Sequence, residues 1–394
     1  MLCATVEQIA ATGPDVVHVI SDAGPHPFFT TLIEAGGFPR ERLAVGCVGP
    51  PGPLQREMAR LGVASFALGA TARSQYPAAV VRLARLLRRR RADIVHAHLV
   101  DGCAVSLSAA RLARTPVAAM TAHHSHELPF HGRRLIWADT VLTGPLADRV
   151  IAPSVLVAGT LERYAHTRPR KIDVVHHGFD LEAIAAGASR RDHWRRALGL
   201  DGRIVIGCIG RLYRLKNQAA LIDAFARVAP ERETAQLLIA GPGDPGPLRA
   251  RAAALGLGER VSFAGEVADV PGLLAAFDAF AHPALAESFG MVIDEAMAAG
   301  LPVLCTPVGI APELIEPGLT GILCKDATAQ SLERGLRALV GMRAAWPELG
   351  ATAATAVAGF TASAMAGRYE QLYRRWLQQP LRSGGPRSPS SGGA

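Results

Sequence analysis

The chain has 394 residues, of which 49% are hydrophobic and 19% charged, and its formal net charge is +8. Its length suits two or three domains, and its composition is that of a globular protein. The sequence has no stretch of 18 or more apolar residues free of charges and turn-forming residues, and its start lacks the pattern of a signal peptide, so we expect a cytoplasmic protein without a membrane span.

Short apolar, β-branched runs alternate along the chain with longer segments whose apolar residues recur at helical spacing. Such alternation is typical of parallel sheets covered by helices on both faces, so an α/β fold is predicted. One doubly wound sheet does not usually hold so many strands, and we therefore expect two such domains in tandem. The predicted strands are 16–21, 43–48, 93–98, 117–123, 149–154, 172–178, 204–210, 236–241, 260–265, 278–284, 302–307 and 320–324.

The break between the two domains is expected in 181–203, which lacks strand character. We predict an N-terminal domain over 1–180 and a C-terminal domain over 181–360. The last residues, 379–394, are rich in Gly, Ser and Pro and are predicted to be disordered.

Six cysteines are scattered along the chain without a Cys-x-x-Cys pair. They are interpreted as the thiols of a cytosolic protein, mostly buried, rather than as a disulfide or zinc framework. They are Cys3, Cys47, Cys103, Cys208, Cys305 and Cys324.

Much of the positive charge lies in the arginine-rich segment 82–91. One hypothesis is contact with an anionic membrane surface or with nucleic acid. The other is an ordinary helix whose last turn carries cations that complement its dipole. No interleaved aromatic residues or nucleic-acid-binding motif accompany the segment, so no nucleic-acid partner is expected.

Two cations follow the predicted strand 204–210 directly. Arg211 comes first and Lys216 five residues later, with a helix predicted to open at Asn217 or Gln218. Because ligands of doubly wound sheets bind beyond the carboxyl ends of the strands, a guanidinium and an ammonium there suit a diphosphate.

The segment 241–246 has the spacing Gly-x-Gly-x-x-Gly between a strand and a helix. Alone, this pattern suggests a nicotinamide or flavin enzyme. Pro242 removes an amide, and Pro245 and Pro247 stiffen the helix entry that would receive a pyrophosphate, so this alternative is disfavoured.

Two glutamates, Glu287 and Glu295, flank the start of a predicted helix near Phe289 or Gly290. Amides at a helix start bind anions, so a phosphate is expected at Gly290 and Met291. Glu287 precedes the helix and Glu295 lies more than one turn inside it. The pair is therefore interpreted as two contacts to one ligand rather than as the acid and base of a hydrolase.

Three segments, "GRLYRLKN", "ESFGMVIDEAMAAGLPVLCTPVGIAPELI" and "VVHHGFD", together resemble the retaining, nucleotide-sugar-dependent glycosyltransferases of the GT-B fold, whose hallmark is a Glu-x7-Glu motif. The resemblance extends over 203–321 and is looser in the N-terminal half. It implies two facing Rossmann-like domains, with the final helix (361–378) crossing back to the N-terminal, acceptor-side domain.

The resemblance also implies roles for individual residues. Arg211 and Lys216 would hold the donor diphosphate, Glu295 the ribose hydroxyls and Glu287 the transferred sugar. Backbone of the donor loops would contact phosphate and sugar, and one histidine would lie near the reacting centre. These further residues are Gly210, Phe289, Gly290, Met291 and His123.

Other histidines have alternative interpretations. His124, His126 and His131 crowd His123, and a metal cluster there is an alternative, which the metal-independent reaction implied by the resemblance disfavours. His96 and His98 flank a strand and are interpreted as structural. His176 and His177 are expected to serve the connection between domains.

The sequence departs from the family pattern at two places. The loop 21–31 has a single glycine, Gly24, where relatives usually have two, which makes acceptor binding the less certain part of the pattern. Gly309 is followed by Ile310 where a second glycine is common, so the approach of that backbone to the donor is in question.

The predicted function is hexosyl transfer from a nucleoside diphosphate sugar, most often UDP in this family, to a glycolipid, polysaccharide or specialised metabolite. No cofactor is expected, and peripheral contact with the inner membrane face remains open. The alternatives are a GT-B-fold sugar-nucleotide epimerase or phosphorylase, a nicotinamide enzyme, and a non-enzymatic carbohydrate-binding protein.

Overall fold

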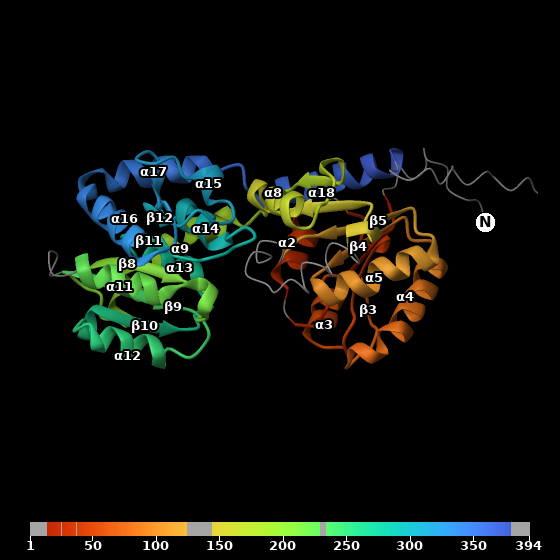
Figure 1. Cartoon of the computed structure of the whole chain (residues 1–394), viewed down its shortest axis with the longest axis horizontal. Helices are drawn as coiled ribbons and strands as arrows, with labels where there is room; N and C mark the ends of the chain where they lie inside the picture. Colours follow the sequence, from red (N-terminus) through yellow and green to blue (C-terminus); the bar gives the residue numbers. More distant parts are fainter. Residues whose placement is uncertain (1–13, 25, 37, 124–143, 229–233, 380–394) are drawn as a thin grey trace, which may run out of the picture. The chain divides into compact units, whose positions relative to one another are not determined.

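The computed structural model describes residues 14–24, 26–36, 38–123, 144–228 and 234–379. The chain forms two compact units (Figure 1). Unit 1 comprises Met1–Gly178 and Ala362–Ala394, and unit 2 comprises Phe179–Thr361. Each unit is an α/β domain of the predicted Rossmann-like kind, with one parallel sheet.

Unit 1 has a seven-stranded sheet in the order β3-β2-β1-β4-β5-β6-β7. Its strands are β1 (Val16–Ile20), β2 (Leu43–Cys47), β3 (Ala64–Ala67), β4 (Ile94–His98), β5 (Val117–Thr121), β6 (Arg149–Ala152) and β7 (Ile172–Val174). Its helices are α2 (Pro27–Ala35), α3 (Pro53–Arg60), α4 (Tyr76–Arg90), α5 (Val100–Ala113), α7 (Gly144–Leu146), α8 (Val155–Tyr164) and α18 (Ala362–Gln378).

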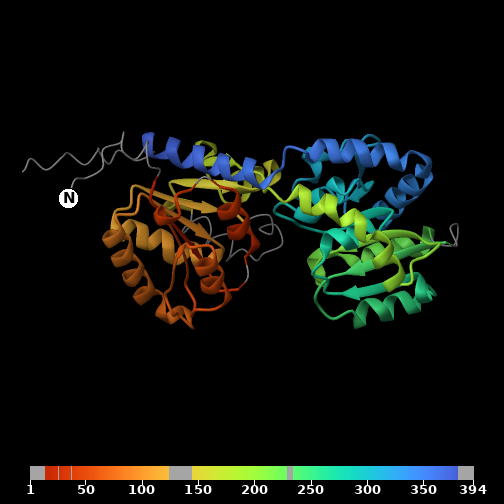
Figure 2. The ribbon, with the colours of Figure 1, turned by 180° about the vertical axis from the view of Figure 1, so that it is seen from behind.

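Both faces of this sheet are covered, because successive residues of a strand point to opposite sides. Residues of α4, α5 and α8 pack on one face. On the other face, α2, α3 and α18 pack on the alternate strand residues. Figures 1 and 2 both show α18, in blue, lying along unit 1, although it comes from the other end of the sequence.

Unit 2 has a six-stranded sheet in the order β10-β9-β8-β11-β12-β13. Its strands are β8 (Ile204–Ile209), β9 (Ala235–Ala240), β10 (Val261–Gly265), β11 (Ala279–His282), β12 (Val303–Cys305) and β13 (Gly321–Leu323). Its helices are α9 (Leu181–Gly187), α10 (Arg191–Ala197), α11 (Gln218–Val228), α12 (Gly246–Ala254), α13 (Val270–Ala275), α14 (Met291–Ala298), α15 (Ala311–Leu314), α16 (Ala329–Gly341) and α17 (Trp346–Val357).

Every strand predicted from the sequence is present, whereas β3 (Ala64–Ala67) was not predicted. This strand is short, lies at the edge of the sheet and begins with two exposed residues of weak strand propensity, Ala64 and Ser65. The segment 181–203, where the break was expected, instead holds α9 and α10 of unit 2. Arg191 and Arg195 of this segment pair with Asp278 just before β11.

The arginine-rich segment forms the end of α4, with Arg88, Arg89 and Arg90 in the last turn and Arg91 in the left-handed region at φ 57°. The five described cysteines are free and buried, as predicted, and Cys3 lies outside the described residues. The predicted tail, apart from Gln379, also lies outside them. Among the described helices, none has both the length and the apolar character that a membrane span requires.

Trp376 is the largest fully buried side chain among the described residues, and its indole Nε1 donates to Asp173 Oδ2 at 2.9 Å. We predict that Trp376→Ala lowers the free energy of unfolding of unit 1 by about 3–5 kcal/mol, because it leaves a large cavity between α18 and the sheet. Urea unfolding followed by circular dichroism measures this. Leu112→Ala, at a side chain that is 46% exposed, is the control and changes the free energy by less than about 0.5 kcal/mol. Equal midpoints for both variants would contradict the assignment of α18 to the core.

Candidate functional site

The candidate site lies where the strand order of unit 2 reverses. From β8 the chain goes to β9 on one side, and β11 lies on the other side of β8. Loops that leave two such neighbouring strands diverge, and this opening is where doubly wound sheets bind ligands. The segments 210–218, 283–291 and 306–311 all follow strands at this edge.

The loop after β8 is held in place by two amide side chains. Gln218, which opens α11 as predicted, is buried, and its Nε2 donates to the carbonyl of Arg211 at 3.0 Å. Asn217 adopts φ 56°, and its Nδ2 donates to the carbonyls of Pro283 at 3.0 Å and Ala327 at 2.9 Å. The loops after β8 and β11 are thereby joined.

Glu287 is the centre of a charged group in this joined region. Its Oε1 accepts a hydrogen bond from the ammonium of Lys216 and lies 3.0 Å from Nε2 of His282. Burial alone would raise the pKa of Glu287, but the hydrogen bonds and charges of His282 and Lys216 lower it to about 2. Glu287 is therefore a stable carboxylate, and it fixes the position of the Lys216 ammonium.

The structure brings Lys216 and Glu287 together, whereas the side chain of Arg211 is exposed and extends toward the ring of Tyr213, 5.9 Å from its centroid. His282, which is buried at the end of β11, is not among the site residues predicted from the sequence. The available signal was its position, because a polar residue at the carboxyl end of a buried parallel strand faces the ligand edge.

Helix α14 begins at Met291, and Gly290 caps it with φ 90°. The ring of Phe289 is buried, so this residue offers only backbone to a ligand. Its carbonyl accepts from the amide of Ile310 at 2.8 Å. At Gly309, φ is 55° and an added Cβ would lie 2.1 Å from the Phe289 carbonyl oxygen, so this position requires glycine. The first amides of an α-helix such as α14 have no partner within the helix.

Two adjacent acids on α14 are perturbed by burial. Burial raises the pKa of Glu295 to about 7. Asp294 is fully buried, neither of its carboxylate oxygens has a hydrogen-bond partner among the described residues, and burial raises its pKa well above the ordinary value. Glu295 is thus the half-buried member that a polar ligand could reach, and its ionisation is sensitive to what binds beside it.

The glycine-rich loop after β9 packs on the loop after β8. An added Cβ at Gly241 would lie 2.2 Å from the carbonyl oxygen of Gly210, and one at Gly243 would lie 2.9 Å from that of Leu212. Both glycines also have positive φ, at 138° and 130°. Close packing of two loops therefore accounts for this glycine pattern without a bound dinucleotide.

In unit 1, His123 follows β5 and is half-buried. Its Nε2 lies 3.0 Å from Nδ1 of His98, and its ring is parallel to that of His177, with centroids 5.8 Å apart. His177 is buried, which lowers its pKa to about 4. His96 and His98 are fully buried, in agreement with a structural role. The histidines weighed as a metal cluster with His123, at 124, 126 and 131, lie outside the described residues.

Two family models match the chain. The one described as glycosyl transferases group 1 matches residues 190–349, and the one described as glycosyltransferase Family 4 matches residues 35–183. Together they cover most of both units, although β1 and α18 of unit 1 lie outside the matched residues.

Individual relatives match over part of their length. The D-inositol 3-phosphate glycosyltransferase of Mycobacterium sp. (strain KMS) is 38% identical over 185 residues, which are 45% of this chain and 41% of that protein. The lipopolysaccharide core biosynthesis mannosyltransferase LpsB of Rhizobium meliloti (strain 1021) is 31% identical over 51% of this chain and 61% of that protein. The chain thus spans less than two thirds of the length of these relatives.

A similarity to solved structures extends over nearly the whole chain. The crystal structure of HepE from Anabaena in complex with UDP and glucose superposes with a TM-score of 0.79 and 23% identity. It covers 91% of this chain and 99% of that one. At this identity the likeness establishes the two-domain fold.

We predict that Glu287→Gln lowers the free energy of unfolding of unit 2 at pH 7 by about 2–3 kcal/mol, because it leaves the Lys216 ammonium without its carboxylate. This loss is somewhat smaller than that for a fully buried pair. The folded-state pKa of Glu287, about 2, is below its ordinary value of 4.5. The stabilisation is therefore fully present above pH 4.5 and is lost as the pH falls toward 2.

Denaturant unfolding of wild type and variant between pH 7 and pH 3 measures this difference. It should stay constant from pH 7 to about 5 and shrink below 4.5. Glu266→Gln, at an exposed position of the same unit, is the control. A difference that grows on acidification would contradict the assigned pair.

Proposed function

The chain belongs to the group 1 glycosyltransferases, and we propose that it transfers a sugar from a nucleoside diphosphate to an acceptor with retention at the anomeric carbon. The observation that carries this proposal is the Lys216–Glu287–His282 group beside the start of α14, at the ligand edge of unit 2. The relatives named above are a D-inositol 3-phosphate glycosyltransferase and a mannosyltransferase, and HepE was solved with UDP and glucose. A UDP-sugar is accordingly the first donor to test.

The proposed contacts to the sugar nucleotide follow from the hydrogen-bond donors and acceptors that each side chain offers. Lys216 has three N–H donors, so its bond to Glu287 leaves two for diphosphate oxygens. Arg211, being exposed, can swing onto the same diphosphate, and the amides of Gly290 and Met291 add the partial positive charge of a helix start. Glu295 would accept from the two ribose hydroxyls, and Glu287 would face the transferred sugar.

The proposed mechanism stabilises charge rather than supplying a nucleophile. Negative charge grows on the diphosphate as the glycosidic bond breaks, and Lys216, Arg211 and the helix amides offset it in place. The sugar passes through an oxocarbenium-like state while the leaving phosphate accepts the proton of the acceptor hydroxyl. This proposal requires no metal ion and no cofactor, and it places His123 beside the sugar.

The alternatives predict different products. An epimerase would return a nucleotide sugar, and a phosphorylase would use inorganic phosphate. A carbohydrate-binding protein would turn over nothing. Thermal shift with a panel of nucleoside diphosphate sugars, followed by product analysis with anomeric assignment by NMR, separates them; retention in a new glycoside supports the proposal.

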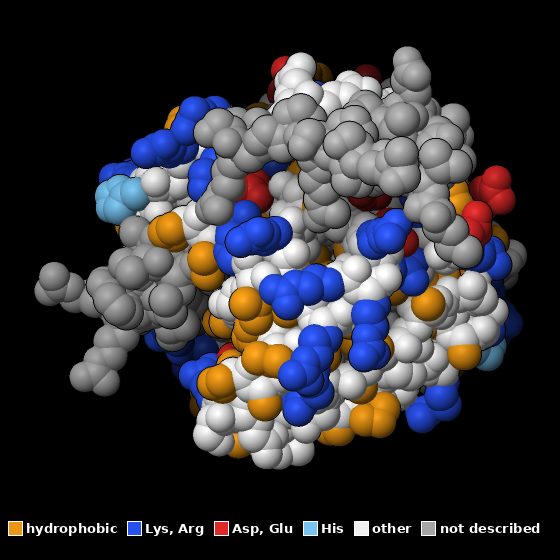
Figure 3. Space-filling view, turned by 90° about the vertical axis from the view of Figure 1, so that its right-hand side faces the viewer, with side chains coloured by type: hydrophobic (Ala, Val, Ile, Leu, Met, Phe, Trp, Pro, Cys, Tyr) orange, Lys and Arg blue, Asp and Glu red, His pale blue; other side chains and the backbone are white. Residues whose placement is uncertain are grey.

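We further propose that unit 1 contacts an anionic membrane surface, where a lipid-linked acceptor would be found. A hollow of about 670 Å³ lies between edge strand β3 and α4, and its charged lining consists of Arg82, Arg85, Arg89 and Arg90. Figure 3 shows Lys and Arg side chains gathered on the face of the molecule that carries α4. Arg90 pairs with Asp15, whereas no acidic partner is found for Arg85 and Arg89 within the described residues. These unpaired charges suit lipid phosphates.

We predict that Lys216→Ala lowers kcat by about 10²–10³, because it removes a donor aimed at the leaving diphosphate. The measurement is steady-state transfer with the donor found in the panel. Arg214→Ala, an exposed cation of the same short helical turn, is the matched control and should keep wild-type turnover. Full activity of the Lys216 variant would refute its role.

We predict that replacing Arg85 and Arg89 by Gln weakens binding to vesicles of phosphatidylcholine with phosphatidylglycerol by roughly 30-fold, at about 1 kcal/mol for each arginine. Vesicle sedimentation measures this at low and physiological salt. The matched control replaces Arg196 and Arg203, two exposed arginines of unit 2. Equal losses in both double variants would show that only net charge matters and would contradict a surface on α4.

A further inference from the structure

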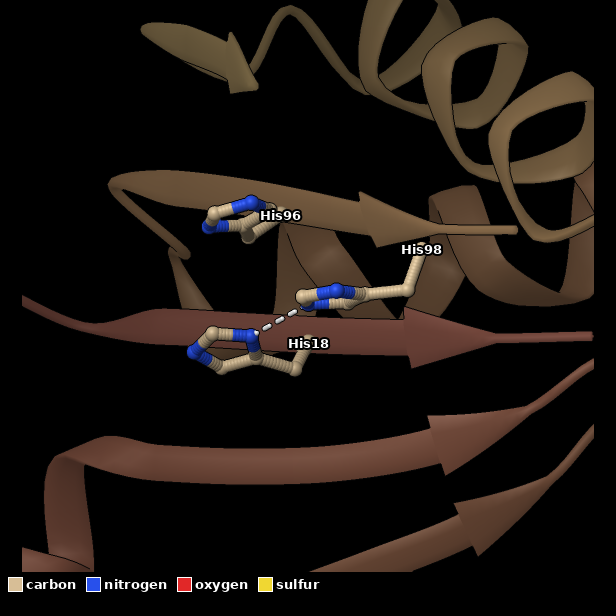
Figure 4. Close-up of side chains that lie close together, drawn as sticks. All are labelled: His18, His96 and His98. Carbon is tan, nitrogen blue, oxygen red and sulfur yellow. Dashed lines mark hydrogen bonds between the residues drawn. The ribbon is translucent and has the colours of Figure 1, made fainter. Parts of the chain in front are cut away.

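The central strands of unit 1 carry a buried group of three histidines. His18 on β1 and His96 on β4 are register partners, and His98 lies two residues further along β4, so all three side chains leave the same face of the sheet. Figure 4 shows their rings stacked over this face. All three are 1% exposed or less, beneath α18. Buried imidazoles demand hydrogen-bond partners.

Hydrogen bonds join these rings to His123. Nδ1 of His98 lies 3.0 Å from Nε2 of His123, and Nε2 of His98 lies 2.9 Å from Nδ1 of His18. Nε2 of His18 in turn lies 3.4 Å from the hydroxyl of Tyr373 on α18. One continuous path therefore runs from α18, along one face of the sheet, to the residue proposed to lie beside the sugar.

The same tyrosine connects to the third histidine. The hydroxyl of Tyr373 lies 2.5 Å from Nδ1 of His96, and Nε2 of His96 lies 2.7 Å from Oγ1 of Thr121. Tyr373 is thus shared between His18 and His96. Both nitrogens of every ring in the group are engaged.

This arrangement is a hydrogen-bond chain and not a metal centre. The facing nitrogens of His18 and His98 are 2.9 Å apart, whereas two nitrogen ligands of one tetrahedral zinc lie about 3.3 Å apart or more. The ring planes of the three histidines are also within 12–22° of parallel, so their lone pairs do not converge on one point.

The hydrogen bonds that join the histidines and Tyr373 allow only two self-consistent arrangements of the protons. Burial lowers the pKa of His18 to about 3 and that of His96 and His98 well below the ordinary value, so each ring is neutral, with one nitrogen donating and the other accepting. The nitrogen that carries the proton in one ring therefore determines which nitrogen carries it in the next ring. The group that holds its proton most firmly thus determines the direction of donation in all the hydrogen bonds.

Tyr373 sets this direction. A hydroxyl donor makes shorter hydrogen bonds than a ring N–H donor, so the 2.5 Å contact is the one in which Tyr373 donates to His96. The phenol oxygen must then accept from His18 Nε2–H across the longer contact. His18 Nδ1 accepts from His98 Nε2–H, and His98 Nδ1 accepts from His123 Nε2–H. The proton of His123 is thereby held on Nε2.

We propose that Tyr373, His18 and His98 are positioning residues for His123, which hold its proton on Nε2. The tautomer of a histidine is set by the hydrogen bond that its other nitrogen makes, and here that bond is relayed over three buried groups. The tautomer assignment stands on geometry alone, whereas its effect on turnover rests on the proposed function.

The test reads the tautomers directly. In protein labelled with ¹⁵N-histidine, two-bond ¹H–¹⁵N NMR correlations identify the protonated nitrogen of each ring, and His123→Gln assigns the signal of His123. In the wild type, His18, His96, His98 and His123 are expected to carry the proton on Nε2. In Tyr373→Phe, His18 loses its acceptor, so the chain reverses and His123 shifts to the Nδ1–H form.

Activity supplies the second measurement. Tyr373→Phe is expected to lower kcat about 10- to 100-fold, with KM for the donor unchanged. Tyr369→Phe is the matched control: it makes the same substitution at an equally buried tyrosine one turn earlier on α18. The hydroxyl of Tyr369 lies 3.5 Å from Oγ1 of Thr121 and makes no hydrogen bond to His18, His96, His98 or His123. It should keep both the tautomers and the kcat of the wild type.

The outcomes separate this inference from the proposed function. An Nδ1–H form of His123 in the wild type, or no change in Tyr373→Phe, overturns the inference. The expected tautomers in a protein without transferase activity support the positioning chain and refute the function instead. Should Tyr373→Phe not fold, the pair His18→Gln, which keeps a donor and an acceptor, and His18→Leu, which keeps neither, serves the same comparison: only the Leu variant should shift His123.

Discussion

The carboxylate of Glu287 is the group on which the ligand edge of unit 2 depends. It is largely buried and remains charged because His282 and Lys216 face it, and those two residues come from different strand ends. The ion pair therefore requires β8 and β11 to be neighbours in the sheet. The amide of Asn217 and the backbone bond from Leu285 to Leu215 hold the same two loops at the correct spacing. Charge, topology and loop conformation are thus mutually dependent here.

Both units carry polar side chains where the order of the parallel strands reverses, between β8 and β11 in unit 2 and between β1 and β4 in unit 1. The two units stabilise these side chains in different ways. Unit 2 keeps charges there, and pairing offsets the cost of burying them. Unit 1 keeps neutral imidazoles, whose nitrogens are all satisfied by one another, by Tyr373 and by Thr121. Neutral hydrogen-bonded rings avoid the free-energy cost of burying a charge, and they still couple the proton position of one ring to that of the next.

Local patterns were sufficient to predict the strands, the start of α11 and the placement of Lys216 and Glu287 near strand ends, because apolar runs and turn residues are local properties. They were not sufficient for β3, whose existence depends on its neighbour in the sheet. Nor could they show that Glu287 accepts from both Lys216 and His282, or that His96 and His98 meet His18 and Tyr373. His96 and Tyr373 are separated by 277 positions, and no local sequence pattern predicts their contact. Asp294 is distinguished from other acidic helix residues only by its burial, which depends on the fold.

The placement of α18 has a consequence for biosynthesis. This helix is translated after all of unit 2, yet it supplies Tyr369, Tyr373 and Trp376 to the core of unit 1. A ribosome-bound chain can therefore complete unit 2 while the first unit still lacks one wall, with the apolar side chains of β1, β4 and α2 uncovered. Unit 1 is therefore the first unit to be translated and the last to complete its fold. The core of unit 1 is complete only once α18 has been made and has packed against it.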